Sequence, residues 1–238
     1  MAMGLIKEYY LRASDFDVNS RLMPQCVLEI FQDIAGAHAE QLGLGFDSLY
    51  EKNLIWVVVR TKYETLKSAT KYSTVKVKTW PLESGGLVFR RDYLITDYDD
   101  NVLIRGSSDW MLVNSESRKL ETNKNIYPEN EEFCRDLAID GKIRKLREYK
   151  GETTCYKVTP RYTDIDVNGH VNNTKYAKFV LDAINPEKGE IKEFQIDYHK
   201  EVLKGQPLEI YTGFEDNTAF SKGVCDSEKM FSCEIRFS

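Results

Sequence analysis

Apolar residues recur at helical spacing from Pro24 to Leu42, which predicts one long helix early in the chain. Proline stands at a favourable early position of this segment, and Gly43 and Gly45 follow its end. Alternating apolar and polar residues predict strands over residues 5–14, 55–63, 73–81, 87–96 and 102–113. Turn-forming residues separate these strands, so this part of the chain predicts a long helix with a curled antiparallel sheet.

The last third of the chain repeats this order of elements in a shorter form. A strand-like run over 153–162 precedes a helix-like run over 173–184, which Asn185 and Pro186 stop. Four further strands are expected, near residues 193–202, 207–214, 219–225 and 230–237. The predicted fold class is α+β, with two units that each combine a helix with an antiparallel sheet.

A short polar segment occurs twice, each time ahead of a helix, with a constant separation of 149 residues. The first copy begins at Arg12 and the second at Arg161, and both contain the sequence Asp-x-Asp-Val-Asn. We interpret this as an internal duplication of the helix-and-sheet unit. Where the second copy has His170, the first copy has Arg21, so chemistry that needs a histidine belongs to the second copy.

Three interpretations compete for the second copy. Its aspartates, asparagines and glycine are typical of a turn that ends in a helix N-cap. Asp164, Asp166 and Asn168 also match the opening of an EF-hand calcium loop, but Lys175 occupies the position of the required bidentate glutamate. The third interpretation is catalytic, because a carboxylate, an amide and the imidazole of His170 alternate beside the amino end of a helix. The segment alone does not distinguish a turn from an active site.

Residues 114–150 lose the strand pattern and carry acidic residues followed by a basic run. We expect a connector that crosses the surface, with an N-terminal unit over 1–122, a linker over 123–150 and a C-terminal unit over 151–238. The basic run consists of Lys142, Arg144, Lys145 and Arg147. A solvated face explains this run slightly better than a dock for an acidic partner.

Composition narrows the function classes. The formal net charge of -5 argues against nucleic-acid binding by bulk electrostatics. The chain has no apolar run of membrane-spanning length and no secretory signal pattern at its amino terminus, so a cytoplasmic location is expected. Five cysteines without a C-x-x-C pair indicate reduced, mostly buried thiols and no zinc site. His38 lies on the apolar face of the first helix and is expected in the core or in a pocket wall.

Several motifs together carry a resemblance to a known family. The most specific is Asp-Val-Asn-Gly-His-Val-Asn-Asn, from Asp166 to Asn173, which opens the second helix. Further matches are Thr79-Trp80, Ser84-Gly85, Arg90-Arg91-Asp92 and the stretch from Tyr198 to Gly205. With the duplicated units, these motifs resemble the acyl-ACP thioesterases of plants and bacteria over nearly the whole chain. The resemblance implies a tandem (double) hotdog fold, in which each long helix is wrapped by an antiparallel sheet.

The resemblance implies hydrolysis of the thioester of fatty acyl-ACP, with release of free fatty acid and the end of chain elongation. The expected enzyme is a thioester hydrolase of class EC 3.1.2.14, without cofactor or metal. The family's catalytic residues fall on Asp166, Asn168, His170 and Glu201. Many plant members have cysteine at the next position, where this chain has Val202, which argues against a cysteine nucleophile and favours Glu201. Glu201 would attack directly or activate water, with Asn168, His170 and helix amides as oxyanion donors.

The resemblance also implies an acidic partner, acyl carrier protein. Candidate docking groups are Arg90, Arg91, Lys142, Arg144, Lys145 and Arg147. The acyl chain is expected in an apolar tunnel of the first unit, where the helix is long and contains small residues. Oligomeric state stays open, with a homodimer as one option, and no membrane insertion is expected.

Rival functions remain. An acyl-CoA thioesterase differs only in the carrier, whereas a hotdog hydratase would show an Asn-Pro-x-His signature that this chain lacks. A non-catalytic acyl-binding protein would keep the tunnel and lose the polar residues. A further question concerns Glu201, because in a regular strand it would share a face with Gln195, Asp197 and His199, and that face could simply be exposed to solvent. A bulge or a strand end would redirect it.

Overall fold

The structure is a computed structural model that describes residues 4–123, 125–129, 132–186 and 189–238. It contains two compact units, of which the first consists of Met1–Ala13 and Glu29–Ile143. The second unit consists of Ser14–Leu28 and Arg144–Ser238. The expected boundaries at residues 122 and 150, between the N-terminal unit, the linker and the C-terminal unit, stay a prediction. No helix in the described part of the chain is long and apolar enough to cross a membrane.

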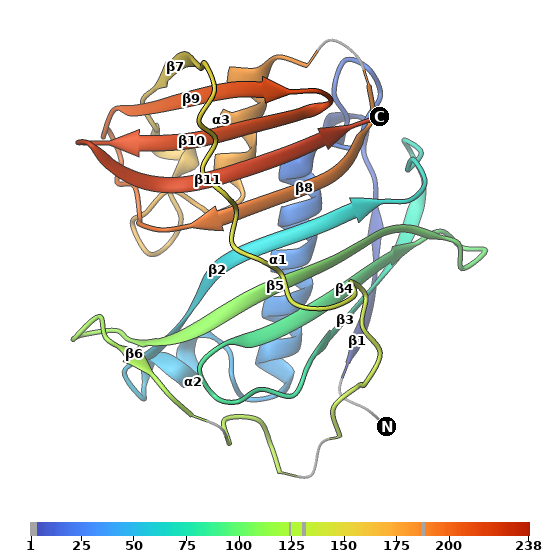
Figure 1. Cartoon of the computed structure of the whole chain (residues 1–238). Helices are drawn as coiled ribbons and strands as arrows, with labels where there is room; N and C mark the ends of the chain where they lie inside the picture. The colour runs from blue at the N-terminus through green and yellow to red at the C-terminus, as the bar shows by residue number, and fades with distance from the viewer. Residues whose placement is uncertain (1–3, 124, 130–131, 187–188) are drawn as a thin grey trace. The chain divides into compact units, whose positions relative to one another are not determined.

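The sheet of the first unit has the strand order β1-β3-β4-β5-β2, and neighbouring strands run antiparallel. Its strands are β1 (Leu5–Tyr10), β2 (Leu54–Thr65), β3 (Thr74–Pro81), β4 (Phe89–Thr96) and β5 (Val102–Asn114). Helix α1 (Pro24–Gln41) lies across this sheet, as Figure 1 shows. Two further elements, α2 (Phe46–Tyr50) and β6 (Leu120–Glu121), were not predicted, because such short segments contain too few residues for a periodic pattern.

The core of the first unit lies between α1 and the sheet. Phe31 of α1 stacks on Tyr93 of β4, with ring centroids 4.1 Å apart. Gly106 of β5 leaves room for this ring, because a Cβ atom at Gly106 would lie 2.3 Å from Phe31 Cε2. Helix α1 ends in a Schellman turn, in which Gly43 takes a φ of +67°. The helix therefore covers the sheet over the length that its periodicity predicts.

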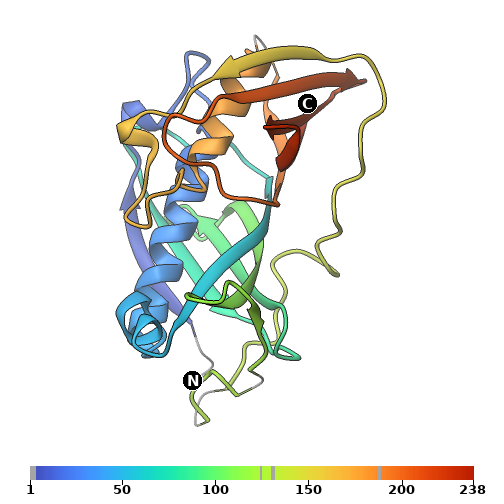
Figure 2. The same ribbon diagram turned by 90° about the vertical axis from the view of Figure 1, so that its left-hand side faces the viewer.

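The second unit repeats the same topology. Its strands are β7 (Thr154–Val158), β8 (Ile191–Tyr198), β9 (Leu208–Glu215), β10 (Thr218–Cys225) and β11 (Glu228–Phe237). They form the antiparallel order β8-β11-β10-β9-β7, which matches the first sheet strand for strand. Helix α3 (Lys175–Ile184) covers one face of this sheet (Figure 2). The equal topologies confirm the internal duplication.

Several strands end earlier than their apolar pattern predicts. β1 stops at Tyr10 and β7 at Val158, and each is followed by a short 3-10 helix, η1 (Ala13–Asp15) or η2 (Tyr162–Asp164). β8 stops at Tyr198, although the pattern continues to Val202. After β7 the Asp164 carboxylate accepts the amide hydrogen of Arg161, which turns the chain. After β8 the regular pairing ends where the N–H groups of His199 and Lys200 share Met230 O of β11.

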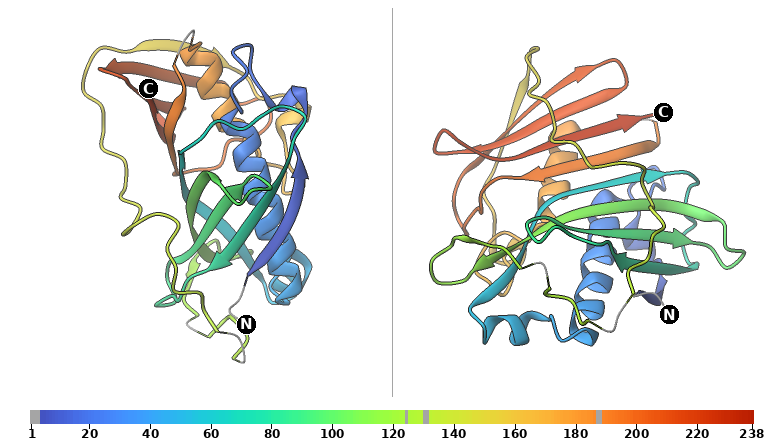
Figure 3. Two further views of the ribbon diagram at one scale, coloured as in Figure 1. Left: turned by 90° about the vertical axis from the view of Figure 1, so that its right-hand side faces the viewer. Right: turned by 60° about the horizontal axis from the view of Figure 1, so that its bottom comes forward.

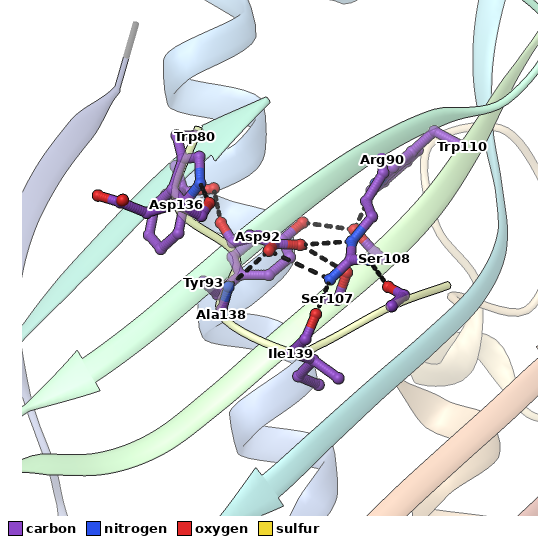
Figure 4. Close-up of polar contacts among 12 residues, drawn as sticks. Trp80, Arg90, Asp92, Tyr93, Ser107, Ser108, Trp110, Asp136, Ala138 and Ile139 are labelled. Atoms are coloured by element: carbon purple, nitrogen blue, oxygen red, sulfur yellow. Dashed lines mark hydrogen bonds and ion pairs between the residues drawn. The ribbon is translucent and has the colours of Figure 1, made fainter. Parts of the chain in front are cut away.

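A buried carboxylate holds the connector against the first sheet (Figure 4). Asp92 of β4 is fully buried and accepts hydrogen bonds from Ala138 N at 2.7 Å and Ser107 Oγ at 2.6 Å. Arg90 also donates to Asp92, through Nε at 2.8 Å, and to the carbonyl oxygen of Ile139. Arg90 and Asp92 therefore fasten the connector to the sheet face opposite α1.

The second sheet holds its part of the connector in a similar way. Asp197 of β8 is 1% exposed, and its Oδ2 accepts the amide hydrogen of Leu146 at 2.9 Å. Gln195 Nε2 donates to Arg144 O at 2.7 Å. Figure 3 shows this segment and α3 on opposite sides of the second sheet. The alternative that this face is open to solvent is therefore wrong for Asp197, because the connector covers it.

Candidate active site

The loop that carries His170 is built around the side chain of Asp166. Asp166 Oδ1 accepts the amide hydrogen of Asn168 at 2.9 Å and that of His170 at 3.4 Å. Asp166 N–H in turn donates to His170 O at 2.8 Å. Gly169 takes a φ of +82°, a left-handed value that glycine adopts without a steric penalty. The Asp166 carboxylate thus folds the turn that presents His170.

Glu201 follows the end of strand β8, on a segment with its own backbone contacts. The N–H groups of His199 and Lys200 both donate to Met230 O, at 2.8 and 3.1 Å. Two residues opposite one is the pattern of a β-bulge, which changes the direction of the following side chains. Because the regular strand ends at Tyr198, Glu201 does not continue the face of the strand behind it.

The two loops bring an imidazole and a carboxylate into contact. His170 Nε2 lies 3.2 Å from Glu201 Oε2, and the side chains are 25% and 42% exposed, so solvent reaches both. The backbones are joined directly after these residues, where Val171 N–H donates to Val202 O at 2.8 Å. A histidine that donates its Nε2 hydrogen to a carboxylate orients that carboxylate. This arrangement can take a proton from water, as general base catalysis requires.

The structure brings two of the four expected catalytic residues into direct contact. Asp166 is half-buried, and its described contacts go to the backbone of its own loop. Asn168 is exposed at the tip of that loop. The catalytic roles of all four residues stay predictions, whereas the position of Asp166 in the turn and the contact between His170 and Glu201 are observed.

The turn and calcium interpretations can be compared with the local bonding. Asn172 Oδ1 accepts from Thr174 N at 3.0 Å and Thr174 Oγ1 at 2.8 Å. Helix α3 is preceded by Thr174, whose side chain makes no cap bond, so the amide at the start of the helix is capped by the side chain of Asn172. Asp164 Oδ2 accepts the amide hydrogen of Arg161 at 2.7 Å, so this carboxylate serves the turn. Within the described residues, no cluster of three His, Cys, Asp or Glu side chains could hold a metal ion.

Two expected docking groups, Arg90 and Arg91, do not lie on an open surface. Arg90 is engaged with Asp92 and the connector, and its side chain is only 13% exposed. Arg91 is buried on the helix side of the sheet, where it donates to His38 Nδ1 at 2.9 Å. Burial and the neighbouring Arg91 charge lower the pKa of His38 to about 4. The docking prediction is wrong for this pair, because strand alternation points one side chain into the core and the other under the connector.

The remaining docking candidates are exposed. They are Lys142, Arg144, Lys145 and Arg147, all of which belong to the connector. Arg147 already contacts Glu215 at 2.8 Å, and its guanidinium lies 5.4 Å from the ring centre of Phe220. The others offer exposed positive charge that an acidic partner could contact.

Two tyrosines beside the loops had no predicted role. Val202 N–H donates to Tyr176 Oη at 3.2 Å, and Tyr198 Oη donates to Asn173 O at 3.0 Å. In the sequence both tyrosines belong to apolar faces of predicted elements, so they are typical core residues. The only available signal was their hydroxyl groups, which need hydrogen-bonding partners when buried.

Comparison with known sequences identifies relatives over nearly the whole chain. The family model for the acyl-ACP thioesterase N-terminal domain matches residues 5–129, and the C-terminal domain model matches residues 147–235. An acyl-[acyl-carrier-protein] hydrolase of Cuphea viscosissima, described as chloroplastic, is 30% identical over 224 residues. A palmitoyl-acyl carrier protein thioesterase of Arabidopsis thaliana, also described as chloroplastic, is 31% identical over 229 residues. Each alignment covers 88% of this chain, which spans about half the length of these relatives (54% and 55%).

Solved structures show the same fold. An acyl-ACP thioesterase from Bacteroides thetaiotaomicron superposes with a TM-score of 0.89 at 23% identity, covering 99% of this chain and 98% of that one. The 12:0-ACP thioesterase from Umbellularia californica gives a TM-score of 0.88 at 24% identity, covering 100% and 98%. These matches confirm the expected tandem hotdog fold.

Proposed function

Because this chain belongs to the acyl-ACP thioesterase family, we propose that it hydrolyses the thioester of fatty acyl-ACP, which releases free fatty acid and ends chain elongation. The observation that carries the proposal is the 3.2 Å contact between His170 Nε2 and Glu201 Oε2. It joins a proton acceptor to a hydrogen-bond donor at a solvent-accessible position. Hydrolysis of a thioester needs such a pair together with a water molecule.

In the proposed reaction, Glu201 takes a proton from a water molecule while the water oxygen attacks the thioester carbonyl carbon. The C–S bond of the tetrahedral intermediate then breaks, and the departing thiolate takes up that proton. Free fatty acid and the thiol of the carrier result. His170 orients Glu201 through its Nε2 hydrogen. The exposed amide of Asn168 supplies a donor to the developing oxyanion, and Asp166 holds the loop that carries both residues.

The test is a hydrolysis panel with acyl-ACP substrates of different chain lengths, each paired with acyl-CoA of the same chain. We expect hydrolysis of at least one acyl-ACP, at a higher kcat/KM than that of the matching acyl-CoA. A higher kcat/KM for acyl-CoA would make the protein an acyl-CoA thioesterase. Binding of acyl chains without hydrolysis of either substrate would instead indicate an acyl-binding protein. The panel also determines the chain-length preference and tests whether EC 3.1.2.14 applies, which stays a prediction.

Docking of the carrier is proposed for the exposed cations of the connector. Lys142, Arg144 and Lys145 would contact the acidic surface of acyl carrier protein. Added salt should then lower kcat/KM for acyl-ACP more steeply than for a short neutral thioester. The double variant Arg144→Glu, Lys145→Glu should raise KM for acyl-ACP only, with Lys52→Glu at an exposed position as a control. Equal salt dependence for both substrates would show that these charges are merely solvated.

The finer expectations of location, tunnel and assembly are also proposals. We retain a cytoplasmic location, although the curated relatives above are described as chloroplastic. The acyl chain is placed in the first unit, beside the apolar cluster of Leu44, Leu49, Phe89 and Leu112. A homodimer is one option for assembly, and sedimentation of the purified protein decides it.

A further inference from the structure

The segment that carries Glu201 lies outside the strands of its sheet, so other groups must hold it. Between the bulge at Lys200 and the start of β9 at Leu208, the chain pairs with none of the strands in the described part of the structure, and an isolated bridge joins Leu203 to His170. Val202, the residue next to Glu201, is fully buried. Its carbonyl oxygen accepts the amide hydrogen of Val171, and its own amide hydrogen goes to Tyr176 Oη at 3.2 Å. Both backbone polar groups beside Glu201 are thus fixed.

Tyr176 is well placed to fix this segment rigidly. It belongs to the first turn of α3 and is 2% exposed. Its ring packs edge-on against Phe231 and Tyr198, with centroid distances of 5.2 and 5.8 Å. These contacts determine where the hydroxyl group lies. Burial raises the pKa of Tyr176, and the negative charges of Glu201 and Asp166 raise it further, so the hydroxyl stays neutral at working pH.

The first copy of the segment lacks this hydroxyl. The separation of 149 residues that aligns Arg12 with Arg161 places Val27 at the position of Tyr176. The same separation places Arg21 at the position of His170. The tyrosine therefore occurs only in the copy that has the histidine and the carboxylate. A residue needed merely to fill the core would not require a hydroxyl group at this position.

We propose that Tyr176 is a positioning residue of the active site, which holds the Val202 amide so that Glu201 meets His170. This inference rests on the proposed thioesterase function. It assigns Tyr176 no contact with substrate. Its effect is exerted through the backbone of the Glu201 segment, so it should depend on the presence of the Glu201 carboxylate.

The test is Tyr176→Phe, which keeps the packed ring and removes the acceptor of the buried Val202 amide. We expect kcat to fall roughly tenfold with KM unchanged, because a buried donor without an acceptor makes the segment move toward another partner. Tyr149→Phe is the matched control, since it also removes one tyrosine hydroxyl bond, to Phe214 O, from the second unit. This control should leave kcat unchanged.

A double-mutant cycle separates positioning from general destabilisation. In the Glu201→Gln background, adding Tyr176→Phe should lower the residual kcat by less than about twofold, because the carboxylate that Tyr176 positions is already absent. An equal loss in both backgrounds, or an unchanged kcat in the single variant, would overturn the proposal.

Nuclear magnetic resonance distinguishes failure of the Tyr176 proposal from failure of the proposed thioesterase function. If the wild-type protein hydrolyses no thioester, the function is wrong, but the position of the segment can still be measured. Tyr176→Phe should shift the amide resonances of Val202 and Val171 and the ring resonances of His170. Unchanged resonances at these residues would show that Tyr176 does not hold the Glu201 segment.

Discussion

The two polar segments at residues 12–21 and 161–170 share one backbone pattern and differ at the residue that closes it. In the first, Asp17 Oδ1 accepts the amide hydrogens of Asn19 and Arg21, each at 2.9 Å. In the second, the carboxylate of Asp166 makes the same pair of bonds. The valines at the two loop tips are 97% and 94% exposed. The shared Asp is therefore architecture that both copies retain.

The closing residues have opposite uses. Arg21 donates to Asp17 Oδ2 at 2.6 Å, to Pro186 O at 2.9 Å and to Gly189 O, so it ties the first loop to the chain after α3. His170 instead meets a carboxylate from another loop. The first copy thus has a structural role, through the hydrogen bonds of Arg21, whereas the second copy carries the candidate catalytic residues. The motif by itself therefore does not mark an active site. Only the copy whose closing residue meets a carboxylate from another loop carries the candidate chemistry.

The segments that follow β2 and β8, the equivalent strands of the two units, also share a backbone pattern and differ in their side chains. After β2, Leu66 N–H and Lys67 N–H both donate to Leu103 O, which repeats the bulge at His199 and Lys200. This bond pattern places Ser68 at the position of Glu201, whereas alignment of Tyr63 with Tyr198 places Leu66 there. Neither residue is a carboxylate. The first copy therefore lacks both members of the His170 and Glu201 pair.

The largest expected effect comes from removing one member of that pair. His170→Ala or Glu201→Gln should each lower kcat by roughly 100-fold or more, as loss of a general base or its partner does. Arg21→Ala, the equivalent change in the first copy, should lower the melting temperature and leave kcat unchanged. Steady-state kinetics and thermal unfolding measure both. Near-normal turnover in both variants of the pair would remove the site assignment.

The two turn-forming aspartates provide a finer test. Asp17→Ala and Asp166→Ala each remove the acceptor of two backbone amides, so each should reduce the free energy of unfolding by about 1 to 2 kcal/mol. Only Asp166→Ala should also reduce kcat, because its loop presents His170. Urea unfolding and kinetics of both variants check this. Equal losses of kcat would mean that the two loops do not differ in function.

The smallest expected effect concerns the histidine of the first unit. His38 lies beside the Arg91 cation, and burial lowers its pKa to about 4, below its ordinary value. The unfolded chain therefore binds the proton first as pH falls, and stability is lost between about pH 6.5 and 4. At pH 5.5 this loss should be about 1 kcal/mol relative to pH 7. Urea unfolding of His38→Gln should show a flatter pH dependence, and an unchanged slope would contradict the assignment.

Local patterns predicted the elements and the duplication, because helix and strand periodicity depends on neighbouring residues. They also singled out Asp166, Asn168 and His170, which lie within five residues of each other. Glu201 was found through a family resemblance, since it is 31 residues from His170 in sequence. Only the tertiary structure decided that the two meet, because the bulge after β8 depends on a bond to β11.

Burial was the other feature that only the tertiary structure decided. Alternation along β4 predicts that Arg90 and Arg91 face opposite sides of a sheet, but not what covers each side. The connector covers one side and α1 the other, so neither arginine is available for docking. The same reason applies to Asp197 under the connector and to Tyr176 beneath Val202. A sequence determines which residues share a face, whereas contacts between distant segments determine which faces are open and which groups meet.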